Sequence, residues 1–332
     1  MNYRTFGKTG WQVSEIGFGG WAIGAAKWGT QDDQESLKAL HRALDLGVTF
    51  IDTAQAYGNG HSERLISQAL KERGEKIGNG KVRVATKIPP VPGNWPPFPE
   101  DRIEERFPEE YLREKVEYSL KNMDAEVLDV VQLHTWTRAW NRKLVALDVL
   151  QDLKKEGKLL AVGVSTPEHD QNSLIEPMRQ GKLDAVQVIY NIFEQEPRAE
   201  FLPVAEENGV GIIVRVVFDE GSLTGKFDIN TTFEKDDFRN LYFKGDRLQD
   251  TVKRVEKIKQ TITKFGFSES DLPSIAIRFA LQHSAVSTVI PGIRNVDQAE
   301  KNCTVSDLAV LPTELYEKLQ KHIWRRGFWY AG

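Results

Sequence analysis

Short apolar runs alternate with amphipathic helical patterns along almost the whole chain, and this alternation constrains the fold most. Runs this apolar are typical of strands that are buried on both faces of a sheet. Repeated strand–helix units predict parallel pairing, and eight such strands can close into a barrel. Eight strands are predicted, over residues 15–19, 49–52, 82–87, 127–133, 159–164, 185–189, 211–214 and 286–290.

The segments between these strands have the periodicity of helices. An open doubly wound sheet is the competing fold, but it usually carries a GxGxxG phosphate turn after its first strand. The stretch GFGGW at residues 17–21 does not fit that turn, which weakens the open sheet without excluding it. We therefore predict one α/β domain over residues 1–332, a (β/α)8 TIM barrel with long loops at its C-terminal mouth and an N-terminal β-hairpin. The helical patterns cover residues 34–46, 62–72, 108–123, 144–155, 167–180 and 200–208.

Charge and cysteine content exclude several classes of protein. The 44 basic and 48 acidic side chains give a net charge of −4, so no global basic field would attract nucleic acid or an anionic membrane. No apolar run approaches the roughly 18 residues of a membrane-spanning helix, and the start of the chain lacks the apolar core of a signal peptide. The single cysteine, Cys303, excludes an intrachain disulfide and favours a reducing compartment. A soluble, cytoplasmic protein is predicted.

Two segments are too long to be simple connections between a strand and a helix. Residues 88–107 contain six prolines together with Trp95 and Phe98, and residues 222–250 are rich in Phe, Asp and Gly. Long loops in a compact domain are usually functional or disordered, and both of these follow strand C-termini. The aromatic side chains favour ordered loops that close over a ligand.

Four proton-handling side chains lie at or just beyond the ends of successive strands: Asp52, Tyr57, Lys87 and His134. In a β/α barrel these strand ends converge on one mouth. A carbonyl that receives hydride becomes an alkoxide and must be protonated, but a tyrosine with a pKa of about 10 is a poor acid. A neighbouring ammonium, held by the carboxylate, would lower that pKa, and His134 could donate a hydrogen bond to the carbonyl oxygen.

Each of these side chains also has a simpler interpretation when taken alone. Asp52 could cap a turn, and Tyr57 could be a half-buried loop aromatic. Lys87 could be a solvated strand terminus, and His134 a satisfied histidine near the core. Their joint placement at successive strand ends favours the catalytic interpretation. A metal site is not predicted, because the histidines share no metal-binding spacing.

The order Asp52–Tyr57–Lys87–His134, within the stretches DTAQAYG, ATKI and VVQLH, closely resembles the catalytic tetrad of aldo-keto reductases. The resemblance extends from GKTG at residues 7–10 to IPGIRNVDQAEKN at residues 290–302. It is closest to bacterial members that are distantly similar to potassium-channel β subunits. It implies a (β/α)8 barrel that binds NADP(H) in an extended pose without a Rossmann fold.

The resemblance also implies a cofactor site. Ser165 and Gln187 match positions that hydrogen-bond the nicotinamide carboxamide, although Ser165 could instead cap a helix and Gln187 could fill a barrel layer. Residues 220–226 resemble the loop that folds over the pyrophosphate, where Lys226 would supply charge unless it is a solvated lysine. The full set implied is Gly20, Trp21, Asp52, Ser165, Gln187, Arg215, Val216, Phe218, Gly221, Leu223, Lys226, Gly292, Arg294, Gln298 and Asn302.

Within that set, Gly292, Arg294, Gln298 and Asn302 match the adenosine-phosphate segment of the family. A helix predicted to begin near Asn295 would turn its N-terminus toward an anion. The guanidinium of Arg294 suits a bidentate contact with a 2′-phosphate, which favours NADPH over NADH. The alternative for Arg294 is a surface arginine near a helix start.

Three features depart from the family pattern. Arg215 stands where many relatives carry the Trp or Tyr that stacks on the nicotinamide, and a guanidinium plane can also stack. Lys301 replaces a Glu that contacts adenine in many relatives. Thr135 and Trp136 follow His134 and predict an aromatic substrate wall. The predicted substrate-contacting residues are Trp21, Trp28, Tyr57, Trp95, His134 and Trp136, of which one or two tryptophans could merely pack loops.

We therefore predict an NADPH-dependent oxidoreductase that reduces aldehydes or ketones to alcohols, with Tyr57 as general acid. An NADP(H)-binding redox-sensing subunit with slow or vestigial turnover is the alternative, and a barrel enzyme of proton transfer without redox chemistry is a third. The predicted partner is a small carbonyl compound, and the predicted state is a monomer or weak homo-oligomer. The sequence does not decide whether the aromatic tail at residues 324–330 lies over the mouth or below the barrel.

Overall fold

The computed structural model describes residues 1–24, 31–327 and 329, and its centre is a barrel of eight parallel strands. Neighbouring strands pair in chain order, and the last strand returns to the first through bridges Ile16–Val289 and Gly19–Gly292. These bridges close the sheet, so the predicted (β/α)8 barrel is confirmed. The strands are β3 (Phe18–Gly19), β4 (Phe50–Asp52), β5 (Arg83–Ile88), β6 (Leu128–Leu133), β7 (Leu159–Ser165), β8 (Ala185–Ile189), β9 (Gly211–Arg215) and β10 (Val286–Val289).

The predicted N-terminal hairpin is also present and covers the end of the barrel where the strands begin. Strands β1 (Tyr3–Phe6) and β2 (Trp11–Ser14) pair antiparallel, with Phe6 opposite Trp11. Phe6 is fully buried among apolar side chains that point inward from the barrel strands. A Cβ on Gly211 would lie 2.8 Å from the Phe6 ring, so the approach of hairpin to strand requires glycine there. The hairpin therefore closes the floor of the barrel.

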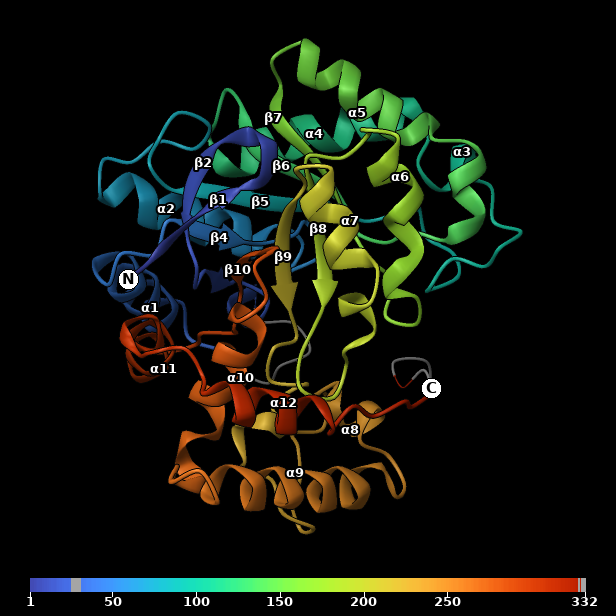
Figure 1. Ribbon diagram of the computed structural model, residues 1–332. Helices are drawn as coiled ribbons and strands as arrows, with labels where there is room; N and C mark the ends of the chain where they lie inside the picture. The colour runs from blue at the N-terminus through green and yellow to red at the C-terminus, as the bar shows by residue number, and fades with distance from the viewer. Residues whose placement is uncertain (25–30, 328, 330–332) are drawn as a thin grey trace.

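Helices surround the barrel, and their buried faces form one continuous core with the outer faces of the strands (Figure 1). One predicted helix, over residues 167–180, is wrong in its first half. The structure has a 3-10 turn at Gln171–Leu174 and a short helix that starts only at Ile175, because Pro177 tolerates only the first turn of a helix. The helices after the barrel strands are α1 (Asp33–Asp45), α2 (His61–Glu72), α4 (Glu109–Met123), α5 (Val145–Lys155), α6 (Ile175–Arg179), α7 (Phe201–Glu207), α10 (Leu272–Leu281) and α11 (Val296–Cys303).

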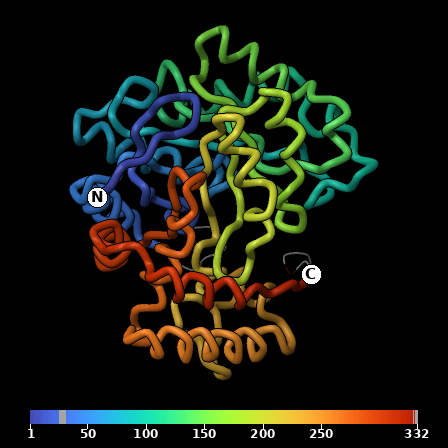
Figure 2. The backbone as a smooth tube through the Cα atoms, viewed as in Figure 1, coloured from blue at the N-terminus to red at the C-terminus, as the bar shows by residue number. Residues whose placement is uncertain are grey.

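Additional helices lie at the mouth, where the strands end. The arrowheads of β8 and β9 point toward the side occupied by α9 (Arg247–Thr263) and α12 (Thr313–Gln320) (Figure 1). The tail after α12 runs across the same side (Figure 2). The long segments of residues 88–107 and 222–250 carry the short helices α3 (Ile103–Arg106) and α8 (Arg239–Tyr242). The described part of the tail, residues 324–327 and 329, therefore lies on the side of the mouth, a placement that the sequence left open.

Candidate active site

Three of the four predicted catalytic side chains meet in one hydrogen-bonded group. Lys87 Nζ donates to Asp52 Oδ2 at 2.6 Å, to Thr53 O at 2.8 Å and to Tyr57 Oη at 2.9 Å. Lys87 is completely buried and Asp52 is 3% exposed. Because Lys87 donates into Tyr57 Oη, the phenol keeps its own hydrogen for another acceptor.

The barrel places these groups by strand register. In the parallel pair β4–β5, Asp52 lies opposite Ala85, so Lys87 is two residues further and faces the same side. Tyr57 follows in a tight loop whose backbone bonds Tyr57 N to Ala54 O at 3.0 Å. Gly58 has φ +64 and lies against the Gly24 carbonyl, where a Cβ would overlap. Glycine is therefore needed to bring the tyrosine loop against the strand end.

A second set of donors holds the other oxygen of Asp52. Gln187 Nε2 lies 2.7 Å and Gln132 Nε2 3.5 Å from Asp52 Oδ1. Both glutamines are buried, and Gln132 Oε1 has no hydrogen-bond partner within the described residues. Sequence reasoning missed Gln132, although it lies in β6 two residues before His134, which directly follows that strand. Alternate residues of a strand share a face, and this spacing was the signal that could have identified it.

Burial dominates the electrostatics of Tyr57. It raises the pKa of the phenol above 10.0, while the charge of Lys87 acts in the opposite direction. The ammonium of Lys87 lowers this pKa as expected, but the loss of hydration on burial outweighs it, so the net pKa of Tyr57 is raised. For Lys87, burial opposes ionisation, but Asp52 and Tyr57 together hold its pKa above 10.5. The site thus pairs a protonated phenol with an ammonium.

His134 lies beside this group as a neutral imidazole. Burial, with the charges of Lys87 and Arg215, holds the pKa of His134 well below 6.5. Its ring meets Tyr57 edge-on at 5.8 Å and Trp95 edge-on at 5.7 Å between centroids. A neutral ring carries one N–H, so His134 can donate one hydrogen bond to a carbonyl oxygen held near Tyr57.

The predicted aromatic wall is only partly present. Trp21 stacks on Tyr57 at 6.0 Å and meets Phe238 at 4.9 Å, and Trp95 is 45% exposed beside His134. Phe238 comes from the long segment after β9 and was not predicted, because no sequence period connects it to the tetrad. Trp28 lies outside the described residues.

Trp136 does not belong to that wall. It is 0% exposed, packs edge-on against Trp140 at 5.4 Å, and donates its indole N–H to Asn141 Oδ1 at 2.7 Å. Its assignment to the substrate pocket is wrong because the chain after β6 turns this ring into the core behind the mouth. The position of an aromatic residue after a strand end does not reveal which side of the loop its ring takes.

Several of the predicted nicotinamide contacts converge beside Asp52. Ser165 and Gln187 are paired residues of β7 and β8. Gln187 donates a hydrogen bond from its Nε2 to Asp52 Oδ1. Its Oε1 makes no hydrogen bond within the described part of the chain. An amide oxygen so placed matches the N–H2 of a carboxamide. A Cβ on Gly20 would lie 2.7 Å from Asp52 O, so this glycine is required by strand packing alone.

Arg215 extends from the end of β9 toward the loop after β7. Its Nη2 donates to Thr166 O at 3.0 Å and lies 3.6 Å from Glu168 Oε1. Its charge lowers the pKa of His134 and acts to lower the pKa of Tyr57. The guanidinium therefore lies within electrostatic reach of the tetrad. It therefore lies at the edge of the tetrad.

The next segment, residues 216–226, folds into turns. Val216, Asp219 and Glu220 have φ values of 56, 48 and 56, and Gly221 has φ 100. Phe218 is half-buried and Lys226 is exposed. Leu223 is 0% exposed within the core, so its side chain cannot contact a cofactor as implied; only its backbone remains for that role.

The residues implied for the adenosine phosphate gather at the start of α11. Asn295 caps this helix by accepting from Gln298 N at 2.9 Å, and Gln298 Oε1 accepts from Arg294 N at 2.8 Å. Asn302 Nδ2 donates to Gly292 O at 3.4 Å. Arg294 Nε donates to Gln31 Oε1 at 2.9 Å, which orients the guanidinium. A helix N-terminus beside an oriented arginine fits a phosphate group.

Together these residues fit a nicotinamide dinucleotide better than a metal. The unpaired Gln187 oxygen, the glycine at φ 100 and Arg294 correspond to the amide, pyrophosphate and phosphate parts of such a molecule. No group of three His, Cys, Asp or Glu side chains within the described residues is arranged to hold a metal ion. No described helix is long and apolar enough to cross a membrane.

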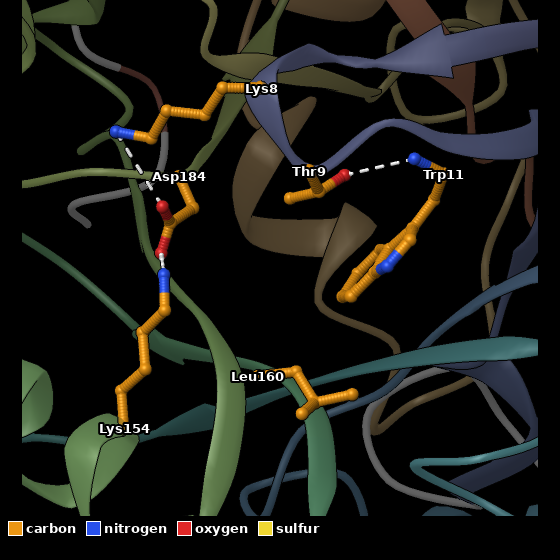
Figure 3. A pocket seen from close by; sticks show the side chains of 6 residues that line it. All are labelled: Lys8, Thr9, Trp11, Lys154, Leu160 and Asp184. Carbon is orange, nitrogen blue, oxygen red and sulfur yellow. Dashed lines mark hydrogen bonds and ion pairs between the residues drawn. The ribbon is translucent and has the colours of Figure 1, made fainter.

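A surface hollow at the hairpin end of the barrel lies apart from this site. It has a volume of about 490 Å³ and lies beneath the N-terminal hairpin, lined by Lys8, Thr9, Trp11, Lys154, Leu160 and Asp184 (Figure 3). Two lysines there share one carboxylate: Lys154 Nζ lies 2.6 Å and Lys8 Nζ 3.5 Å from Asp184. Barrel enzymes carry their chemistry at the other end, where the strands finish.

A closed (β/α)8 barrel whose mouth holds a buried Asp–Lys–Tyr group beside a neutral histidine defines a class of barrel oxidoreductases that use a nicotinamide cofactor. The family model described as "Aldo/keto reductase family" matches residues 15–323. The chain belongs to the aldo/keto reductase family.

Relatives and solved structures agree with this assignment. Aldo-keto reductase YhdN of Bacillus subtilis is 32% identical over 307 residues, which cover 90% of this chain and 87% of that protein. The NADH-specific methylglyoxal reductase of Escherichia coli is 26% identical, covering 97% and 100%. A probable voltage-gated potassium channel subunit β of Oryza sativa is 27% identical, covering 96% of each. These matches confirm the predicted relation to bacterial reductases and to channel β subunits.

The fold is shared with a solved aldo-keto reductase. AKR11C1 of Bacillus halodurans, in its holo form, superposes with a TM-score of 0.75. The match covers 99% of this chain and 98% of that one at 22% identity. At that identity the likeness supports the (β/α)8 fold alone.

Proposed function

We propose that this protein reduces aldehydes or ketones to alcohols with NADPH, and that Tyr57 is the general acid. The observation that carries the proposal is the bond from buried Lys87 Nζ to both Asp52 Oδ2 and Tyr57 Oη, at 2.6 and 2.9 Å. When bound, the reduced nicotinamide would supply a hydride to the carbonyl carbon. The remaining steps belong to side chains of this chain.

His134 would donate its N–H to the carbonyl oxygen and orient the substrate between Trp21 and Trp95. As the carbonyl becomes an alkoxide, Tyr57 would transfer its phenolic proton to that oxygen, which completes the alcohol. The resulting phenolate would be stabilised by Lys87, whose position Asp52 fixes. Solvent would then reprotonate Tyr57. Alcohol oxidation is the same path in reverse, with its direction set by the cofactor ratio.

The choice of NADPH rests on Arg294. A guanidinium oriented by Gln31 at the start of α11 suits a 2′-phosphate, which NADH lacks. One relative is named as NADH-specific, so membership of the family does not decide between NADPH and NADH. The proposed preference for NADPH therefore rests on residues of this chain. We also propose that the substrate is a small carbonyl compound, since the aromatic walls suit apolar groups. A lone buried cysteine suits a reducing cytoplasm.

The test is a panel of aldehydes and ketones, followed by NADPH absorbance, with cofactor affinity measured separately by fluorescence titration. The proposal predicts NADPH binding and turnover of at least one class of carbonyl. Tight binding with slow turnover of every compound would support a redox-sensing subunit instead. Failure of the folded protein to bind NADPH would contradict the proposal.

Arg294→Ala tests the cofactor preference. Loss of a contact to the 2′-phosphate should weaken NADPH by roughly tenfold to a hundredfold, as expected for a charge-assisted bond of about 1.5–3 kcal/mol. NADH binding should change little. Lys301→Ala is the matched control, because Lys301 pairs with Asp297 at 2.8 Å on the exposed side of the same helix. Equal losses for both cofactors would refute the assignment of Arg294.

A further inference from the structure

The turn at residues 216–220 has a backbone conformation that its amino acids rarely adopt. Val216, Asp219 and Glu220 all have positive φ values, 56, 48 and 56. A β-branched residue such as valine rarely adopts this region, and such conformations persist only when the surroundings impose them. The turn leads into residues 220–226, which the resemblance to the family implies fold over the cofactor pyrophosphate. Something outside the turn must therefore hold it.

The C-terminal tail contacts the turn through Asp219 and can keep it in this conformation. This carboxylate is 0% exposed and accepts from Ser222 Oγ at 2.9 Å and from Tyr242 Oη at 3.4 Å. Its strongest partner is Arg326, whose Nη1 donates to Oδ2 at 3.0 Å and whose Nη2 donates to Oδ1. Two parallel bonds from a guanidinium fix both position and orientation of a carboxylate. We call Asp219 and Arg326 the tail pair.

Arg326 is itself held on several sides. Its guanidinium lies over the rings of Trp329 at 4.8 Å, Trp324 at 5.1 Å and Tyr242 at 5.7 Å. Trp324 N donates to Phe193 O at 2.9 Å, in the loop after β8. Aromatic faces attract a cation and exclude water from it. The tail pair is therefore a fixed connection between the chain end and the mouth.

The tail pair is connected through backbone hydrogen bonds to the segment that is expected to contact the cofactor. Asp219 N bonds to Val216 O at 2.9 Å, and Gly221 N bonds to Phe218 O at 3.0 Å. A shift of Asp219 would therefore move Phe218 and the glycine whose φ of 100 allows close backbone approach. A hollow of about 250 Å³ adjoins the pair and is lined by Val216, Asp219 and Arg326 among others. The turn is therefore incompletely packed on this side, where the ion pair contacts it.

We propose that Arg326 is a positioning residue, which through Asp219 holds residues 216–226 in the shape that retains the nicotinamide cofactor. The C-terminal tail then sets how fast the cofactor leaves. This inference rests on the proposed function, because it takes residues 216–226 as cofactor-contacting. Arg326 touches neither the tetrad nor the reacting atoms, and it acts through Asp219.

Stopped-flow fluorescence of NADPH release from the full-length protein tests the proposal. Arg326→Ala should raise the NADPH dissociation rate by roughly tenfold, within the range typical of coupling between two sites. Arg325→Ala is the matched control, since its exposed neighbouring side chain carries the same charge, and it should change the rate by less than about twofold. Arg326→Lys should fall between the two, because one ammonium cannot hold both carboxylate oxygens.

Hydrogen exchange in the protein without cofactor supplies a second readout. Amides of residues 216–226 should exchange faster in Arg326→Ala than in Arg325→Ala, while amides of β4 and β5 stay protected in both. In steady state, KM for NADPH should rise without a matching fall in kcat, whereas loss of folded enzyme would lower the apparent kcat and leave KM unchanged. If Arg326→Ala does not fold, the Arg326→Lys comparison decides.

Unchanged NADPH release in Arg326→Ala or Arg326→Lys, in a protein whose wild type binds NADPH, would overturn the proposal. A wild-type protein that binds no NADPH would instead contradict the proposed function. The two failures are therefore distinguishable.

Discussion

Two buried ion pairs at the mouth of the barrel are built from nearly the same groups and serve different purposes. The central pair, Asp52–Lys87, touches Tyr57, and the tail pair, Asp219–Arg326, touches Tyr242. In the central pair the cation donates to the tyrosine oxygen. In the tail pair it is the carboxylate that accepts from the tyrosine, at 3.4 Å. The neighbour of the phenol is thus an ammonium in one case and a carboxylate in the other.

That difference decides what each tyrosine can do. Burial and the charge of Asp219 hold the pKa of Tyr242 well above 10.0, so it can only remain a neutral donor. Burial also raises the pKa of Tyr57, but Lys87 opposes the rise and would stabilise a phenolate. A tyrosine that must give up a proton needs a cation beside it. The central pair therefore suits proton transfer, and the tail pair suits attachment of the chain end.

The two pairs also differ in the elements that carry them. Asp52 and Lys87 stand on adjacent strands in fixed register, whereas Asp219 and Arg326 stand on a turn and a tail. Sites on regular elements are positioned more precisely than sites on loops. Movement of the tail pair would change cofactor retention while leaving the reacting groups in place.

The largest expected effect is on catalysis by the central pair. Lys87→Met removes the cation beside Tyr57 and should slow carbonyl reduction by about 100- to 10,000-fold. Arg326→Met should leave the reduction rate within about tenfold when NADPH is saturating. Initial rates at saturating NADPH measure both. Comparable losses in the two variants would remove the distinction between the pairs.

The second effect is on stability. Lys87→Met leaves the buried carboxylate of Asp52 without its cation and should lower the free energy of unfolding by about 3–5 kcal/mol. The double variant Asp52→Leu/Lys87→Met removes both charges and should recover part of that loss without recovering activity. Urea denaturation followed by circular dichroism gives both values. A double variant no more stable than Lys87→Met would show that burial of the charge is not the cause.

A pH-dependent effect should separate the two regions further. His134 has a pKa well below its unfolded value of 6.5, so the folded state favours the neutral ring. Its contribution to stability is present above pH 6.5 and is lost as the pH falls toward the folded pKa. Melting temperatures should therefore fall less steeply below pH 6.5 in His134→Gln than in the wild type.

His283→Gln is the comparison variant for that experiment. Burial lowers the pKa of His283 as well, but this residue contacts Tyr190, far along the chain from the tetrad. It should flatten the pH dependence of melting in the same direction. Only His134→Gln should also reduce kcat/KM for the carbonyl. A loss of kcat/KM in His283→Gln of equal size would contradict a specific role for His134.

The smallest effect is expected from Tyr242→Phe. Its 3.4 Å bond to Asp219 is long beside the bonds from Arg326, so its loss should lower stability by about 1 kcal/mol or less. Reduction by enzyme that already holds NADPH should be unchanged. Thermal melting and a single-turnover rate check this. A large loss of rate would mean that the tyrosine of the tail pair has a chemical role.

The sequence predicted most of the barrel because its strands are buried and therefore apolar. All eight strands lie within a few residues of their predicted places, and the first is shorter, Phe18–Gly19, because only this part enters the ladder. Asp52, Lys87 and His134 could be identified because strand ends converge in any barrel. Gln132 was overlooked, although its spacing of two residues from His134 places both side chains on the same face at the end of β6.

The loop-borne parts of the site were harder to predict. Trp136 was placed in the wrong environment because the side of a loop that a ring occupies depends on tertiary packing. Arg326 is 107 residues from Asp219, and no periodicity or motif connects a tail to a turn. The net pKa direction of Tyr57 was also misjudged, since the depth of burial is not visible in sequence.

The central claim is that Tyr57, bonded to Lys87, donates the proton in carbonyl reduction. A single-turnover experiment with NADPH already bound tests it directly, comparing wild type with Tyr57→Phe. Tyr57→Phe should bind NADPH with unchanged affinity. It should oxidise NADPH about 100- to 10,000-fold more slowly in the presence of an aldehyde. Oxidation of NADPH at the wild-type rate in Tyr57→Phe would contradict the claim.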